Sequence, residues 1–281
     1  MTIKYFKYNR MIGAIVGDIV GSIYEFAPVK SVSFDLFTPW SNFTDDTVMT
    51  LAVAKWLMED DAHTPSYLIF CMQELGAAYP GAGYGARFAG WLCEDEPQPY
   101  NSWGNGAGMR VSPVGLYAKT IDDALALAAV TACVSHNHPE GVKGAQAIAT
   151  CMFLCRQGKD KAEIKEYVEK TFFYNLNRTI ADIRPQYEFD VSCQGSVPEA
   201  IIAFLEGSSF EEVIRLAVSL GGDADTIACM AGAIAACMYP IPDEIVGRCN
   251  NILPEDLREI KDQFEDFIKN SNVGNVSSVN M

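Results

Sequence analysis

Two short segments of the sequence combine a pair of carboxylates with a threonine hydroxyl. One is Thr44-Asp45-Asp46 and the other is Asp223-Ala224-Asp225-Thr226, and an apolar stretch follows each of them. Oxygen ligands of this kind suit Mg²⁺, Mn²⁺ or Ca²⁺ rather than zinc. The alternative is that each segment only caps a helix, because Asp and Thr side chains accept hydrogen bonds from free backbone N–H groups. Taken alone, each segment favours the cap.

Asp18 adds a further carboxylate that needs a partner. It lies inside an apolar run, and it shares one face of a predicted helix with Ser22 and Glu25, at positions i, i+4 and i+7. A buried carboxylate requires a cation or hydrogen-bond donors, and none of these acidic segments contains Lys or Arg. We therefore expect two divalent ions that share ligands, about 3.5–4 Å apart.

Two loops carry residues that suit a bound ligand. Residues 104–108 have the sequence Gly-Asn-Gly-Ala-Gly, which leaves the backbone open to an approaching molecule. Successive N–H groups in such a loop can form an anion-binding nest for a diphosphate, although a flexible turn is the better interpretation from composition alone. The second loop contains His136 and His138, and two histidines without a third ligand make a weak zinc site.

Helices must position these groups, because helical periodicity dominates the chain. Residues 32–37 alternate weakly, as a strand would, and residues 80–85 and 97–115 are predicted as loops rich in Gly and Pro. No repeat or linker divides the sequence, which predicts one all-α domain over residues 11–269, with a leader (1–10) and a polar tail (270–281). The expected helices are residues 11–26, 47–59, 65–78, 122–134, 141–157, 161–171, 197–206, 210–220, 226–238 and 255–269.

The first predicted helix carries a regular glycine pattern. Gly13, Gly17 and Gly21 recur every four residues, so they line one face of that helix. A face without side chains lets another backbone come close. The pattern therefore predicts tight helix packing and a central place for this helix.

The composition excludes several classes of function. The chain has 281 residues, of which 49% are hydrophobic and 20% charged, so it can bury a large core. Its net charge of -15 argues against binding to nucleic acid or anionic lipid. The 9 cysteines are odd in number and form no CxxC pair, which indicates a reducing, cytoplasmic compartment. No apolar run reaches the roughly 20 residues that span a bilayer, and a monomer is our default expectation.

Five segments of the sequence resemble the ADP-ribosylglycohydrolase family, the relatives of dinitrogenase-reductase-activating glycohydrolase. They occur in the order found in that family, and they span most of residues 11–240. The segments are GDIVGSIYE (17–25), FTDDT (43–47), WGNGAGMR (103–110), SHNHPEG (135–141) and GGDADT (221–226).

The resemblance implies an all-α fold, a single large orthogonal helical bundle, whose site holds two Mg²⁺ or Mn²⁺ ions. It implies that Glu25 is the catalytic glutamate, and that Glu25 or an aspartate of the metal shell, Asp46, orients or deprotonates a water molecule. The glycine loop would bind the phosphates and adjoining ribose of ADP-ribose, and His136 would help to hold the substrate. The implied metal ligands are Thr44, Asp45, Asp46, Asp223, Asp225 and Thr226, and the implied loop residues are Gly104, Asn105, Gly106, Ala107 and Gly108.

The implied reaction is hydrolysis of the glycosidic bond between ADP-ribose and an acceptor, which is a protein side chain, with arginine favoured, or a small molecule. One alternative is a catalytically silent ADP-ribose-binding or structural protein of the same fold. Another is a two-metal phosphohydrolase that cleaves the diphosphate instead. Ala224 replaces the Ser or Thr that is frequent in the family, and Gly108 replaces Ala or Ser, but neither change removes a ligand.

Overall fold

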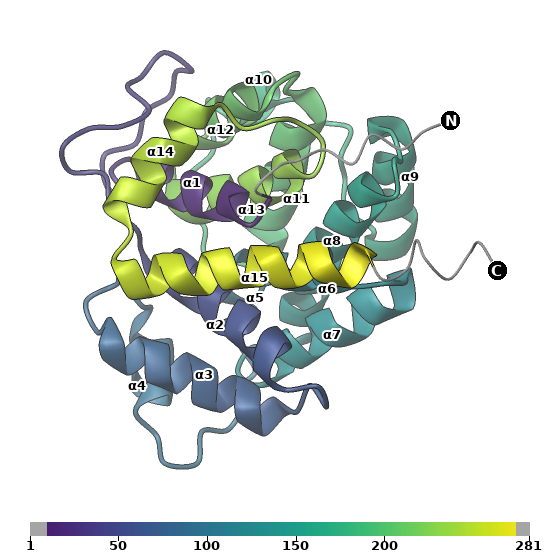
Figure 1. Ribbon diagram of the computed structural model, residues 1–281. Helices are drawn as coiled ribbons and strands as arrows, with labels where there is room; N and C mark the ends of the chain where they lie inside the picture. The colour runs from purple at the N-terminus through teal and green to yellow at the C-terminus, as the bar shows by residue number, and fades with distance from the viewer. Residues whose placement is uncertain (1–9, 274–281) are drawn as a thin grey trace.

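The computed structural model describes residues 10–273, and within this range the protein consists of fifteen α-helices and the loops that join them (Figure 1). This confirms the predicted all-α class. The helices are α1 (Ile12–Gly21), α2 (Asp45–Glu59), α3 (Pro65–Ala78), α4 (Ala86–Leu92), α5 (Gly106–Met109), α6 (Ser112–Tyr117), α7 (Ile121–Cys133), α8 (Pro139–Arg156), α9 (Lys161–Phe172), α10 (Ile180–Ile183), α11 (Cys193–Glu206), α12 (Phe210–Val218), α13 (Ala224–Ala236), α14 (Asp243–Ile252) and α15 (Glu255–Val273).

All ten helices that periodicity predicted are present, and the largest difference concerns the first of them. It was expected to continue to residue 26, but α1 ends at Gly21. The Ser22 hydroxyl donates a hydrogen bond to the carbonyl of Ile19 at 2.9 Å, and the chain continues as turns. Short polar side chains compete with the helical backbone in this way.

Five short helices were not predicted, and two other expectations were wrong. Residues 97–115 were expected to form a loop, but they contain α5 and the first four residues of α6. Four-residue helices such as α5 and α10 are too short to show a hydrophobic period, and α14 contains one Gly and two Asn, which are weak helix formers. The expected strand at 32–37 consists of bends and coil, and the only bridge in the described chain joins Gly104 to Ser192.

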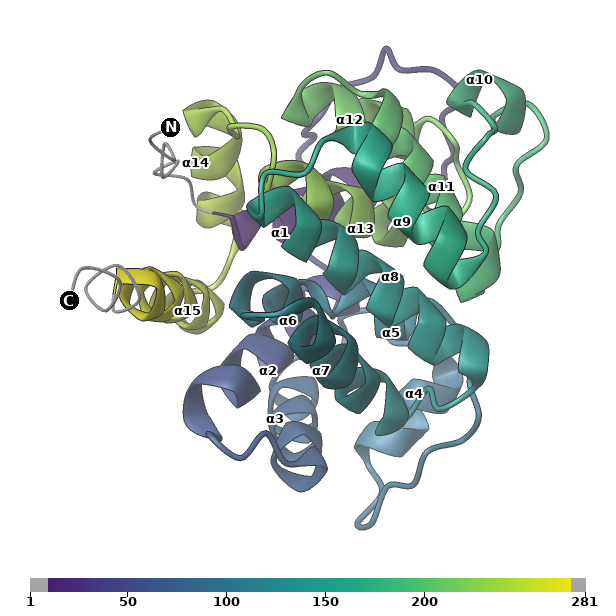
Figure 2. The same ribbon diagram turned by 90° about the vertical axis from the view of Figure 1, so that its right-hand side faces the viewer.

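The glycine face of α1 packs directly on α13, as the sequence predicted, and the two helices lie together in both views (Figure 1, Figure 2). A Cβ atom on Gly17 would lie 2.0 Å from the carbonyl oxygen of Ala228, and one on Gly21 would lie 2.4 Å from the Cα of Asp225. No side chain fits between these backbones. The pair therefore fixes the position of Asp18 relative to Asp225.

The last helix, α15, packs on α2 and also reaches the start of α1. Glu265 accepts a hydrogen bond from the backbone N–H of Met11 at 2.7 Å. Residues 270–273 continue this helix beyond its predicted end, whereas the rest of the expected polar tail and residues 1–9 of the expected leader lie outside the described residues.

Two further sequence expectations concern the cysteines and the membrane. All nine cysteines lie in the described range, and all of them are free thiols, as expected for a protein without a disulfide framework. Among residues 10–273, none of the helices combines the length and the apolar composition needed to cross a bilayer.

Candidate active site

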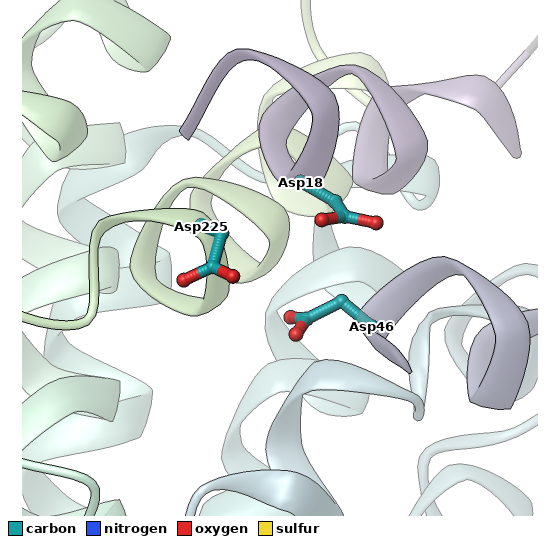
Figure 3. Close-up of side chains that lie close together, drawn as sticks. All are labelled: Asp18, Asp46 and Asp225. Carbon is teal, nitrogen blue, oxygen red and sulfur yellow. The ribbon is translucent and has the colours of Figure 1, made fainter. Parts of the chain in front are cut away.

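Three helices bring aspartates from distant parts of the chain into one place. Asp18 on α1, Asp46 on α2 and Asp225 on α13 are buried, and each offers a carboxylate oxygen within 4.8 Å of the others (Figure 3). Glu25, Asp223 and Asp225 form a second group with the same spacing. Asp225 belongs to both groups, so the two groups are neighbours.

Hydrogen bonds from the beginning of α2 hold the carboxylate of Asp18. It accepts them from the backbone N–H groups of Thr44 at 2.9 Å and Thr47 at 3.1 Å, and from the Thr44 hydroxyl at 2.7 Å. The Thr47 hydroxyl also donates to it. Asp18 therefore joins α1 to the start of α2 and sets the position of the neighbouring Asp46.

The helix caps leave the paired aspartates free for another role. Thr44 is the N-cap of α2, because its hydroxyl accepts a hydrogen bond from the N–H of Asp46. Asp223 occupies the N-cap position of α13, but its side chain makes no capping bond. The capping interpretation is therefore confirmed for Thr44 in the first segment and wrong for Asp223 in the second. The Thr226 hydroxyl donates to Asp46 Oδ2 at 3.1 Å and links the two helices.

Asp45 is not a member of either carboxylate group, but it lies near enough for the charges of Asp18, Asp223 and Glu25 to act on it. It is half-buried, and its Oδ1 atom lies 3.7 Å from the position of a Cβ on Gly83. Its backbone N–H donates to the carbonyl of Ala82 at 2.8 Å, which ties the start of α2 to the loop after α3. As a metal ligand, Asp45 remains a prediction from the sequence, as do the hydroxyls of Thr44 and Thr226.

The acidic groups lack the positive partners that buried carboxylates require. No Lys or Arg forms an ion pair with Asp18, Asp46, Asp223 or Asp225 within residues 10–273. Burial raises the pKa of Asp46 and Asp225 well above the usual range, and the neighbouring carboxylates add to the rise. One buried oxygen of each, Oδ1, has no hydrogen-bond partner.

These features fit a divalent cation. Unpaired buried carboxylates are costly, and a cation with oxygen ligands removes that cost. The free Oδ1 atoms of Asp46 and Asp225 provide lone pairs for it. The two carboxylate groups could therefore hold metal, and Asp225 could contact an ion in either group.

Metal binding should stabilise the protein more strongly at pH 8 than at pH 6. The pKa values of Glu25 and Asp45 are both raised to about 7 by burial and neighbouring carboxylates. The metal-free folded protein thus keeps protons that the unfolded chain releases near pH 4, so its stability falls as pH rises from about 4 towards 7. A cation displaces these protons, and its contribution grows over the same interval.

Thermal unfolding with and without Mg²⁺ at both pH values measures this effect. A Mg²⁺ concentration 100 times the dissociation constant adds about 2.7 kcal/mol to the free energy of unfolding. NaCl at equal ionic strength is the control for charge screening. A specific cation site would be contradicted if Mg²⁺ did not raise the melting temperature. It would also be contradicted if NaCl raised the melting temperature by the same amount.

The glycine loop reaches the second carboxylate group through Asn105. The Asn105 side-chain amide donates to Asp223 Oδ2 at 2.6 Å, and its backbone N–H donates to the carbonyl of Val191 at 2.8 Å. Cys193 N–H bonds to the carbonyl of Trp103 at 2.9 Å, which completes the bridge with the segment before α11. The loop is thus fixed beside the acidic groups.

Only part of the predicted anion-binding nest has free N–H groups. The N–H group of Gly104 donates a hydrogen bond to Ser102 Oγ, and the N–H group of Gly108 donates one to the carbonyl of Asn105. Gly108 is also buried, and a Cβ there would lie 2.9 Å from the sulfur of Met230. Its lack of a side chain serves packing against α13. Among the described residues, Gly106 and Ala107 retain N–H groups without a hydrogen-bond partner.

His136 faces this loop from the end of α7. Its Nε2 atom lies 3.0 Å from the position of a Cβ on Gly106 and 3.5 Å from that on Gly104. Its other ring nitrogen, Nδ1, lies 2.8 Å from Ser135 Oγ. Burial and the charge of Arg110 lower the pKa of His136 well below its usual value, so the ring is neutral.

Asp18 was not among the predicted ligands, and no partner was predicted for Asp223. The position of Asp18 in an apolar run was the signal that it lies close to the site, and the structure places it in the first carboxylate group. The pairing of Asn105 with Asp223 joins residues 118 positions apart. No local pattern encodes such a contact.

Comparisons with known proteins agree with this architecture. A family model described as ADP-ribosylglycohydrolase matches residues 8–273. ADP-ribosylhydrolase ARH3 from Homo sapiens is 26% identical over 304 residues, covering 82% of this chain and 84% of the relative. ADP-ribosylarginine hydrolase Tri1 from Pseudomonas putida (strain GB-1) is 25% identical over 265 residues, covering 83% of this chain and 70% of the relative.

A solved structure, described as an ADP-ribosylglycohydrolase-related protein complex, shares the fold with a TM-score of 0.71 and 23% identity, covering 91% of this chain and 94% of that one. The matched family range includes both carboxylate groups, the glycine loop and His136. The chain belongs to the ADP-ribosylglycohydrolase family.

Proposed function

We propose that this protein hydrolyses the glycosidic bond between ADP-ribose and an acceptor group. The observation that carries the proposal is that two carboxylate groups, the second of which includes Glu25, meet at Asp225 next to the glycine loop. The names of two relatives, an ADP-ribosylhydrolase and an ADP-ribosylarginine hydrolase, support it. We propose that the site uses two Mg²⁺ or Mn²⁺ ions.

The residues that would hold these ions come from three helix ends. When bound, the ions would supply Lewis-acid polarisation of the ligand oxygens in the site. Asp18 keeps the start of α2 in position, and Asn105 orients Asp223. The proposed ligands are Thr44, Asp45, Asp46, Asp223, Asp225 and Thr226, and the structure adds Asp18 and Glu25 to the carboxylates within reach.

Glu25 is the proposed general base, and it is half-buried at the edge of the second carboxylate group. Burial and the charges of Asp223 and Asp18 raise its pKa to about 7, where a carboxyl group both accepts and returns a proton. It takes a proton from water while the water oxygen bonds to C1 of the distal ribose. The bond from C1 to the acceptor breaks in the same step, through an oxocarbenium-like transition state, and the acceptor leaves with the electron pair and takes up this proton.

The remaining polar groups bind the part of the substrate that does not react. We propose that the loop from Gly104 to Gly108 and His136 hold the ADP part, with the N–H groups of Gly106 and Ala107 available for a phosphate oxygen. Asp46 is the second candidate for orienting the water, because its Oδ1 atom has no partner. Binding energy from the ADP part positions the ribose for attack.

The acceptor that we propose first is arginine, which the name of the relative from Pseudomonas putida supports. The substrate is then an ADP-ribosylated protein or a small ADP-ribose conjugate. The nine free thiols support a reducing compartment, and we propose the cytoplasm and a monomer. None of these assignments involves nucleic acid or a membrane.

A substrate panel with product analysis tests the proposal. ADP-ribosyl-arginine, ADP-ribosyl-serine and a small ADP-ribose conjugate are incubated with Mg²⁺, Mn²⁺ or chelator. Release of intact ADP-ribose in the presence of metal supports the glycosidase. Release of AMP indicates a phosphohydrolase instead, and ADP-ribose binding without any product indicates a catalytically silent binding protein.

Replacing Glu25 with glutamine should lower kcat about 100- to 10,000-fold, which is the usual contribution of a general acid–base group. The amide has the shape of the carboxyl but accepts no proton, so ADP-ribose binding should persist. Glu244→Gln, an exposed change on α14, is the control. Single-turnover hydrolysis and calorimetric binding measure the two properties, and wild-type kcat in the Glu25→Gln variant would remove Glu25 from the mechanism.

A further inference from the structure

Arg110 is a fully buried cation without a carboxylate partner in the described chain. Its side chain is 0% exposed, and its Cζ atom lies 5.4 Å from the ring centre of Phe88. Its Nη2 atom donates to the carbonyl of Thr131 and to Ser135 Oγ, both at 2.8 Å. A buried charge is expensive, although its place at the carboxyl end of α7 is favourable for a cation.

The hydrogen bonds of Arg110 decide where the proton of Ser135 lies. Each terminal guanidinium nitrogen carries two hydrogens and accepts no hydrogen bonds. Both hydrogens of Nη2 are therefore donated, and Ser135 Oγ accepts one of them. The single hydroxyl hydrogen of Ser135 remains. Its one other described neighbour is His136 Nδ1, at 2.8 Å.

The opposite arrangement would leave a buried donor without an acceptor. If His136 Nδ1 carried the hydrogen, Ser135 Oγ would accept from both neighbours and its own hydrogen would have no described acceptor. Ser135 is 0% exposed, and an unsatisfied buried donor costs about 1–3 kcal/mol. Nδ1 is therefore the acceptor, and the hydrogen of the neutral ring lies on Nε2.

The ring is oriented so that this hydrogen points at the glycine loop. The ring centres of Tyr100 and Phe88 lie 5.6 Å and 6.1 Å from that of His136, which limits rotation. Nε2 faces Gly104 and Gly106, and no described residue accepts a hydrogen bond from it. A ligand oxygen at the loop would be its acceptor.

We propose that Arg110 and Ser135 are positioning residues that fix His136 in the Nε2–H tautomer, so that it donates a hydrogen bond to a phosphate oxygen of ADP-ribose at Gly104 and Gly106. This inference rests on the proposed function, because it names the ligand of that site. The other tautomer would present a lone pair to an anionic oxygen and repel it. Arg110 thus acts on the ligand through two intermediate side chains.

Nitrogen NMR of the full-length protein, labelled with ¹⁵N-histidine, tests the tautomer directly. The chain has three histidines, and loss of a signal in a His136→Gln variant assigns the ring. We expect a protonated Nε2 and an unprotonated Nδ1 at neutral pH without ligand. A protonated Nδ1, alone or in an imidazolium ring, would overturn the proposal.

Replacing Ser135 with alanine tests how the tautomer of His136 affects ligand binding. The variant should show a mixture of tautomers, and calorimetry with Mg²⁺ should show about 10-fold weaker binding of ADP-ribose, the effect of one lost hydrogen bond. Ser135→Thr, which keeps a hydroxyl, should restore both properties. Ser112→Ala is the matched control, because Ser112 is also buried but its hydroxyl has no hydrogen-bond partner.

The outcomes separate this inference from the proposed function. Unchanged tautomer and affinity in the Ser135→Ala variant would overturn the positioning role, even in an active enzyme. A different result would overturn the proposed reaction and support the positioning role. In that result the protein hydrolyses no glycosidic bond, but its His136 ring carries the hydrogen on Nε2 and the Ser135→Ala variant binds ADP-ribose more weakly. If Ser135→Ala does not fold, the tautomer of the unmodified protein still decides.

Discussion

Replacing Asp225 with asparagine is expected to lower metal-dependent hydrolysis more than about 100-fold. Asp225 is the one residue that belongs to both carboxylate groups, so its loss removes a ligand position from each. Substitution of a residue that only supports a metal ligand lowers metal affinity or activity about 10- to 100-fold, and substitution of a direct ligand should lower the activity further. Release of ADP-ribose at saturating Mg²⁺ is the measurement.

The matched control for this change is Asp122→Asn. Asp122 occupies the same position in the first turn of α7 that Asp225 occupies in α13, but it is exposed. Both substitutions remove the same favourable interaction with the start of a helix. The control should therefore keep full activity. Similar rates in the two variants would show that Asp225 has no special role in the site.

The Asp225→Asn substitution should also make the metal-free protein more stable. Burial and the charges of Asp46 and Asp223 raise the pKa of Asp225, which means that the ionised carboxylate is unfavourable in the folded state without a cation. Asparagine removes this repulsion. We expect a higher melting temperature in chelator and a smaller increase when Mg²⁺ is added, and a lower melting temperature in chelator would contradict the repulsion.

Replacing Gly17 with alanine is the second change with a large expected effect. Its Cβ would lie 2.0 Å from the carbonyl oxygen of Ala228, which is backbone and cannot move independently of α13. Overpacking of a core costs about 1–3 kcal/mol and sometimes more. Separation of α1 from α13 also separates Asp18 from Asp225. We therefore expect a lower melting temperature and weaker stabilisation by Mg²⁺.

Gly247→Ala is the control for this prediction. Gly247 also lies inside a helix, α14, but a Cβ there has no heavy atom within 4 Å. Alanine should stabilise that helix by about 0.5–1 kcal/mol. The two substitutions are chemically identical and should act in opposite directions. Stabilisation by both would show that α1 and α13 do not approach as closely as described.

The sequence predicted the local parts of this site but not how they join. The clusters around Asp46 and Asp225 were recognisable because each is a continuous segment before an apolar helix. That Thr44 is the cap and Asp18 its neighbour depends on how α1 packs on α2. Tertiary contacts set this arrangement of the two helices, and a local sequence pattern holds no information about them.

Two further features show the same limit. The spacing of Gly13, Gly17 and Gly21 predicted a close helix contact, but α13 as the partner emerged only from the structure. Arg110 stands in a segment that was expected to be a loop, and arginine is seldom fully buried. Its burial between Phe88 and the end of α7 depends on tertiary packing.

The contribution of α13 to both carboxylate groups has a consequence for protein synthesis. A ribosome releases Asp18 and Asp46 early, whereas Asp223 and Asp225 follow only after most of the chain has been made. A nascent chain that ends before α13 lacks Asp225 and cannot assemble either group, so the proposed cation site is absent during its early folding. The proposed stabilisation by Mg²⁺ would therefore begin only after α13 has been synthesised.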